Sequence, residues 1–167
     1  LSISNWLTGY WYIFIGITLI IILSIISLEK TEEGRRFFDN LKIKIPGIKK
    51  MNIKIITSRF IRTLSILLSS GIPILQALDA VSKVVGNKIV CDMLEIANED
   101  IRKGVPMSKA IKDMEMFPPM VDSMIKVGEE SGALDDILYK TADFYDEEVE
   151  VSMEKMITML EPILIVF

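Results

Sequence analysis

Two adjacent carboxylates are the strongest candidates for chemistry in this sequence. Glu129 and Glu130 stand between two glycines, in the segment Gly128-Glu129-Glu130-Ser131-Gly132. Such a pair could move a proton or bind a hard divalent cation, because both tasks use carboxylate oxygens. The alternatives are a solvated pair, a helix cap, or a charged turn that contacts a partner.

The residues that would complete an enzyme site are missing from the sequence. It contains no histidine, which removes Ser/His pairs, imidazole acid catalysis and histidine metal ligands. No GxxxxGK[ST] phosphate loop occurs, and Ser131 stands one position too late for a G-x-S-x-G nucleophile elbow. We therefore expect no enzyme, no cofactor and no metal, and we interpret Glu129 and Glu130 as a turn that fixes two helices and offers charge to a partner.

Helical periodicity organises the elements around this turn. Apolar residues recur three or four positions apart, and no stretch alternates with period two. The fold class that we predict is all-α, an antiparallel six-helix bundle with short loops. The predicted helices cover residues 53–70, 73–86, 88–103, 108–114, 120–127 and 133 onward.

Helix-ending residues separate these predicted elements. Gly71 ends the first helix and Pro73 begins the second, as the preferences of these residues at helix ends indicate. Asn87 is the expected N-cap of the third helix, which Gly104 ends. The pair Pro118-Pro119 interrupts the chain before the fifth helix.

The N-terminal part of the sequence predicts a membrane span. Residues 1–28 carry no charge, and residues 10–28 supply the ~20 apolar residues that cross a bilayer. A signal peptide, the rival interpretation, needs a basic start and a cleavage site that this stretch lacks. Lys and Arg follow the span and do not precede it, which places residues 1–9 outside the membrane and the main domain in the cytoplasm.

The remaining segments complete a predicted domain plan. Residues 29–51 form a membrane-proximal linker with a short amphipathic helix, and residues 52–155 form the cytoplasmic helical domain. Residues 156–167 begin a second span, and we expect the chain to be a fragment. Within this span Glu161 either lies at the headgroup level or has a functional role beside the helix-kinking Pro162.

The net charge of −4 is unevenly distributed. Basic residues outnumber acidic ones from Glu29 to Thr63, which suits a surface of anionic lipid. Acidic residues dominate from Leu64 onward, which argues against nucleic acid as a partner. The acidic run between Asp143 and Glu150 is either a solvated helix face or a docking face.

Several motifs, in their order and spacing, resemble the type II secretion F-domain family. These proteins are the inner-membrane platforms of type II secretion, type IV pilus and competence pseudopilus machines. The resemblance implies the C-terminal half of such a protein, with one six-helix cytoplasmic domain. The matching motifs are FIRTLSILLSSGIPILQAL from Phe60, GVPMSKAI from Gly104, FPPM from Phe117, MIKVGEESGALDDIL from Met124 and LEPILI from Leu160.

The resemblance implies a role in assembly and no catalysis. It suggests a multi-pass protein of the cell (inner) membrane that links a cytoplasmic hexameric assembly ATPase to prepilin or pilin subunits. Further implied partners are other inner-membrane components, membrane lipid and a second copy of the protein. Two alternatives stay open: a membrane-tethered helical signalling or adaptor module without catalysis, and a metal-dependent membrane enzyme that uses the carboxylates.

The residues that match the family's motifs are our candidates for partner contact or for structure. We expect that reversing the charge of Glu129 and Glu130 together abolishes assembly and leaves the fold intact. The candidates are Arg62, Leu64, Gly71, Pro73, Asn87, Gly104, Pro118, Gly128, Glu129, Glu130, Ser131, Gly132, Leu134, Glu161 and Pro162.

Overall fold

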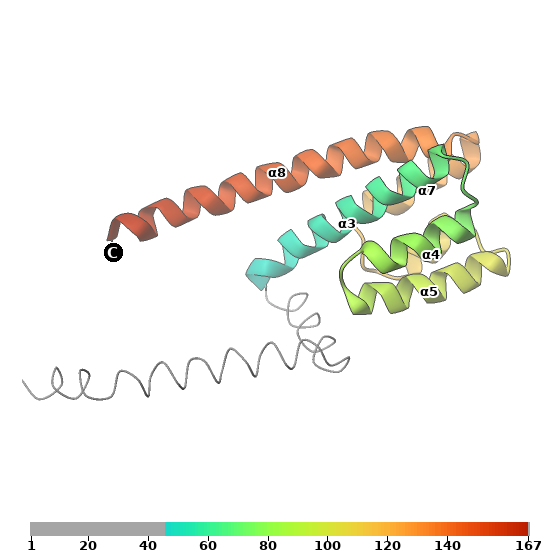
Figure 1. Cartoon of the computed structure of the whole chain (residues 1–167), viewed down its shortest axis with the longest axis horizontal. Helices are drawn as coiled ribbons and strands as arrows, with labels where there is room; N and C mark the ends of the chain where they lie inside the picture. The colour runs from blue at the N-terminus through green and yellow to red at the C-terminus, as the bar shows by residue number, and fades with distance from the viewer. Residues whose placement is uncertain (1–45, 167) are drawn as a thin grey trace, which may run out of the picture. The chain divides into compact units, whose positions relative to one another are not determined.

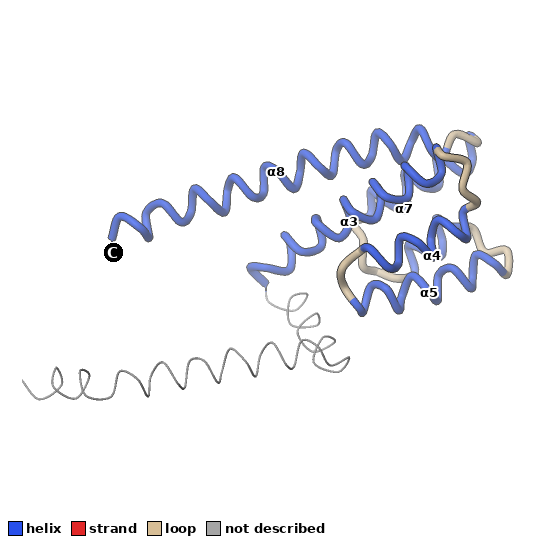
Figure 2. The backbone as a smooth tube through the Cα atoms, in the orientation of Figure 1, coloured by secondary structure: helices blue, strands red, loops and turns tan. Residues whose placement is uncertain are grey.

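Six helices make up the part of the chain that the computed structural model describes, which is residues 46–166, with side chains from 49 to 158. Short loops join the helices, and no strand occurs among these residues (Figure 2). The all-α prediction is therefore confirmed. The helices are α3 (Pro46–Ser69), α4 (Ile74–Val84), α5 (Lys88–Arg102), α6 (Met107–Asp113), α7 (Pro119–Ser131) and α8 (Leu134–Val166) (Figure 1).

Most helix boundaries lie within about two residues of the prediction, and two of them differ by more. Among the described residues, α3 covers Pro46–Ser69, so the chain is already helical before the predicted start at Ile53. Helix α7 continues through Gly128 to Ser131 instead of ending near Val127. Glycine inside a helix costs only about 1 kcal/mol relative to alanine, so Gly128 alone does not end it.

Successive helices pack on one another, and α8 completes the arrangement. Helix α3 packs on α4, α4 on α5, α5 on α6, α6 on α7 and α7 on α8. Helix α8 then packs along α3, with which it lies side by side and antiparallel (Figure 1). The first and last described helices are therefore neighbours, and α8 fixes the position of both α3 and α7.

One hydrophobic core fills the space between these helices. Phe60 of α3 is fully buried and its ring stacks on that of Phe117 at 4.5 Å between centroids. Burial of each large apolar side chain of this kind stabilises the folded state by roughly 1.5–3 kcal/mol relative to leaving it exposed. Other fully buried members are Ile61, Leu64, Leu78, Val81, Leu94, Met107, Ile111, Ile125 and Leu138.

The predicted helix ends at Gly71, Asn87 and Gly104 are confirmed. The side chain of Asn87 accepts hydrogen bonds from the amides of Ile89 and Val90 at 3.0 and 3.2 Å, as an N-cap does. After α3 and α5, Gly71 and Gly104 have positive φ angles of 80° and 94°. In both places the next amide donates back to a carbonyl inside the helix, which satisfies groups that the helix end would leave open.

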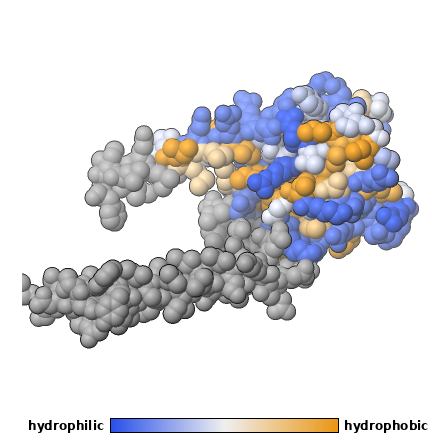
Figure 3. Space-filling view, in the orientation of Figure 1, coloured by the Kyte–Doolittle hydropathy of each residue, from blue (hydrophilic) through white to orange (hydrophobic). Residues whose placement is uncertain are grey.

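The predicted membrane segments stay predictions. Residues 10–28 lie outside the described part, and none of the described helices contains a stretch that is long and apolar enough to cross a bilayer. Figure 3 shows hydrophilic surface along the upper side of α8 and apolar surface on its lower side, up to where the described side chains end. Val151, Met153, Met156 and Ile157 are the large apolar residues exposed in the outer part of α8.

Candidate partner-binding surface

The chain reverses direction at Gly132 and Ala133, between α7 and α8. Gly132 has a φ angle of 71°, a left-handed conformation that ends α7 and that glycine adopts without a steric penalty. The Ser131 hydroxyl donates to the carbonyl of Gly128 at 3.4 Å. Leu134, the first residue of α8, packs against the core. The two glutamates therefore lie in the last turn of α7, before the reversal.

Gly128 allows α7 and the start of α8 to approach closely. It is buried, and a Cβ atom at this position would lie 2.7 Å from Cδ1 and 2.9 Å from Cα of Leu134. The second of these atoms belongs to the backbone, which cannot rotate away. A side chain at this position would therefore force the two helices apart.

Glu129 is bonded to the N-terminus of α6. Its Oε1 accepts a hydrogen bond from the Met107 amide at 2.6 Å. Its Oε2 accepts from the amide and the hydroxyl of Ser108, at 3.2 and 2.6 Å. The residue before α6 is Pro106, whose side chain makes no cap. A distant carboxylate therefore supplies the acceptor that the first amides of this helix need.

Glu130 faces solvent. Its nearest cation is the Lys126 ammonium, 3.8 Å from Oε1, and both side chains are about two-thirds exposed. An exposed pair at this distance contributes little to stability. Reversing both glutamates would consequently disturb the fold through Glu129 as well as any contact of Glu130, so the two residues need separate tests.

A groove of about 850 Å³ lies between α6 and α7, beside Glu130. We call it the α6–α7 groove. Its charged residues are three lysines and four carboxylates, one of which, Glu129, is already bonded to α6. The lining residues are Pro106, Ser108, Lys109, Lys112, Asp113, Asp122, Lys126, Glu129 and Glu130.

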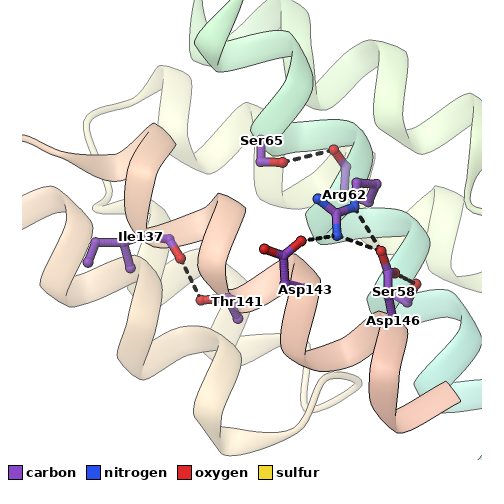
Figure 4. A network of polar contacts seen from close by, with 7 residues as sticks. All are labelled: Ser58, Arg62, Ser65, Ile137, Thr141, Asp143 and Asp146. Carbon is purple, nitrogen blue, oxygen red and sulfur yellow. Dashed lines mark hydrogen bonds and ion pairs between the residues drawn. The ribbon is translucent and has the colours of Figure 1, made fainter. Parts of the chain in front are cut away.

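Arg62 lies at a second polar site, between α3 and α8. Figure 4 shows its guanidinium between two carboxylates of α8: it donates to Asp146 at 2.6 and 2.9 Å and to Asp143 at 2.5 Å. The Ser58 hydroxyl donates to the other oxygen of Asp146 at 2.5 Å. The hydrogen bond to Asp143 is the main cause that raises the pKa of Arg62 above its ordinary value. The guanidinium also lies over the Tyr139 ring, at 5.2 Å.

The same contact line continues one turn further. The Lys54 ammonium donates to Glu148 at 2.6 Å and to the Ser152 hydroxyl at 3.0 Å. The hydrogen bond and charge of Lys54 lower the pKa of Glu148. We call this line the α3–α8 seam, and its residues are Lys54, Ser58, Arg62, Asp143, Asp146, Glu148 and Ser152.

The seam divides the acidic run of α8 between two environments. Asp143, Asp146 and Glu148 bind cations of α3, whereas Glu147 and Glu150 are exposed. The run is therefore neither wholly solvated nor wholly a docking face. Lys54 and Ser58 were not predicted to have a role, although Lys54, Ser58 and Arg62 are spaced four apart and so share one helix stripe.

The other candidate residues do not line the groove. Gly71, Asn87 and Gly104 end or cap helices, and Pro73 and Pro118 immediately precede α4 and α7. Leu64 is in the core. Glu161 and Pro162 belong to α8, but their side chains lie outside the described range.

Comparison with known proteins identifies the class. The family model described as "Type II secretion system (T2SS), protein F" matches residues 60–167. The chain belongs to this family.

The relatives come from two kinds of machine. The chain is 42% identical to a type IV pilus assembly protein PilC of Thermus thermophilus, over 82% of this chain and 34% of the relative. It is 35% identical to PilC of Myxococcus xanthus, over 99% and 40%. It is also 35% identical to a type II secretion system protein F of Aeromonas hydrophila, over 81% and 35%. The chain thus spans about a third to two fifths of the length of these relatives.

Within the described residues, no group of three or more His, Cys, Asp or Glu side chains is arranged to bind a metal ion. The seam and the groove both contain cations beside the carboxylates. The cations of the seam already pair with its carboxylates.

Proposed function

We propose that the protein to which this chain belongs is a platform of a type II secretion or type IV pilus assembly machine in the inner membrane. The observation that carries the proposal is the match to the protein F family together with relatives named for both machines. In this role the protein links a cytoplasmic hexameric ATPase to pilin or pseudopilin subunits and catalyses no reaction itself.

The helical arrangement supports a mechanical role. Helix α8 begins directly after the turn that follows Glu130 and continues through its 33 residues to Val166, a length of about 50 Å. It packs along α3, and the α3–α8 seam adds charged hydrogen bonds to this contact. A force applied at the α6–α7 end would pass along α8 toward the end of the chain that we propose enters the membrane.

The charge distribution supports an orientation for this platform. The basic residues between Glu29 and Thr63, apart from Lys54 and Arg62 of the seam, would face anionic lipid, and the described domain would project into the cytoplasm. Charged groups on that domain would then set which partner binds and in which orientation.

Deletion of the gene in its native host tests the proposal. We expect loss of surface filaments in electron micrographs or of secreted proteins from the medium, and recovery when the full-length gene is restored. The assembly ATPase should co-isolate with the tagged full-length protein from solubilised membranes. Normal filaments and normal secretion in the deletion strain would refute the proposed function.

A further inference from the structure

We propose that the α6–α7 groove is the docking site for a polypeptide segment of a cytoplasmic partner, and that this segment carries both acidic and basic side chains. The inference rests on the proposed function and adds the place of contact and the chemistry of the partner. Three observations carry it: the pattern of charges, the absence of close ion pairs between them among the described residues, and the hydrogen bonds of Glu129 that hold α6 in place.

The charges of the groove form two ordered rows. On α7, Asp122, Lys126 and Glu130 are spaced four apart, so they form one stripe whose charge alternates. On α6, Lys109 and Lys112 are three apart and line the same groove. Asp113 of α6 also lines the groove, so a ligand would meet two lysines and a carboxylate on one side and alternating charges on the other.

These charges make fewer close ion pairs than several lysines elsewhere on the described surface. Lys83 pairs with Asp79 at 2.8 Å, and Lys140 pairs with Asp136 at 2.8 Å, each within its own helix. Within the groove, the shortest ion pair among the described residues is the 3.8 Å contact of Lys126 with Glu130.

The balance of signs selects a polypeptide of mixed charge. With Glu129 bonded to α6, three lysines face three other carboxylates. A uniformly anionic ligand such as nucleic acid would be repelled by Asp122 and Glu130, and a polybasic one by Lys109 and Lys112. A segment that presents both signs can pair with each row, and like-charge contacts would exclude other partners.

Glu129 is a positioning residue in this account. It holds the first amides of α6, and α6 carries Lys109 and Lys112 into the groove. Glu130, the neighbouring residue, makes the contact with the partner. The two glutamates thus serve one surface in different ways.

Photo-crosslinking in the native host tests this proposal with the full-length protein. A photoreactive amino acid replaces Lys112 or, separately, Glu130, and matched controls carry it at the exposed positions Lys83 and Glu99. We expect one identifiable protein, different from this chain, to crosslink at both groove positions and at neither control. Lys112→Glu should lower the yield at position 130 by about tenfold, whereas Lys83→Glu should leave it unchanged.

Thermal unfolding and membrane level of each variant show whether the fold survives, and Lys112→Gln replaces Lys112→Glu if the latter does not accumulate. Crosslinks only to a second copy of this chain, only to lipid, equally at the controls, or to nothing would overturn the groove proposal. In these cases the platform function still stands if gene deletion abolishes filaments or secretion. A deletion without effect would instead refute the function itself.

Discussion

Two neighbouring glutamates have different tasks because they lie on a helix. Successive residues of a helix point about 100° apart, so when Glu129 is directed at the amides of α6, Glu130 is directed at solvent. The sequence predicts the motif as a charged site beside a reversal of the chain. It does not predict that the two glutamates have different roles, because these roles depend on α7 continuing past Gly128 and on where α6 packs.

Loss of the Glu129 carboxylate should destabilise the fold. In Glu129→Ala, the amides of Met107 and Ser108 lose their acceptor, and caps of this kind contribute about 1–2 kcal/mol. Denaturant unfolding of the purified protein measures the change. Glu130→Ala, the matched control, should stay within about 0.5 kcal/mol of the parent chain. Equal losses in the two variants would contradict the assignment.

Gly128→Ala should also destabilise the protein, by about 1–3 kcal/mol, because the added methyl group overpacks the contact with Leu134. Helix propensity alone predicts the opposite, a gain of about 1 kcal/mol. Gly132→Ala meets no atom within 4 Å, so its cost is that of the left-handed backbone alone, about 1–2 kcal/mol. Denaturant unfolding curves distinguish the two expectations for Gly128→Ala. A stabilised variant would disprove the close approach of α7 to the start of α8.

At the level of helices, the α3–α8 seam is the feature that could not be predicted from the sequence. Periodicity predicted most of the helices and their apolar faces, since burial imposes that pattern. Periodicity did not reveal that α3 packs on α8. The two helices are far apart in the chain, and the residue pattern of one helix does not identify the helix on which it packs. The stripe of Lys54, Ser58 and Arg62 can be assigned a role only from its hydrogen bonds to α8. These bonds go to Asp143, Asp146 and Glu148.

A double-mutant cycle can measure the seam. With Arg62→Met and Asp146→Asn, we expect a coupling energy of about 1 kcal/mol, because the pair is only partly exposed and the guanidinium makes two hydrogen bonds to Asp146. The exposed pair Lys140 and Asp136 is the control, with about 0.3–0.5 kcal/mol. A seam coupling no larger than the control would mean that the seam does not hold α8 in register.

The lowered pKa of Glu148 gives the seam a pH dependence. A carboxylate whose pKa is lower in the folded state stabilises the fold above its unfolded pKa, about 4.3, and loses this effect as the pH falls through the folded value. The stability difference between the parent chain and Glu148→Gln should therefore be present at neutral pH and shrink as the pH falls below about 4.3. Unfolding curves across this range measure it, and a constant difference down to pH 3 would exclude the effect.

For the whole described domain, the packing of α8 on both α3 and α7 links the seam to the α6–α7 groove. The fold class followed from the sequence because every helix carries an apolar stripe, and the family followed from the motif series. The groove did not follow from the sequence, because it is formed between α6 and α7 and its shape depends on the hydrogen bonds by which Glu129 holds α6. What α8 does beyond its described side chains stays a prediction from the apolar residues 162–167.

Filament assembly or secretion by a Glu130→Lys strain tests the central claim most directly, which is that Glu130 meets a partner while Glu129 holds the fold. The full-length variant should reach the parent level in the membrane and unfold at the parent temperature, yet lose most surface filaments or secreted protein. Normal assembly by this stable variant would contradict the account.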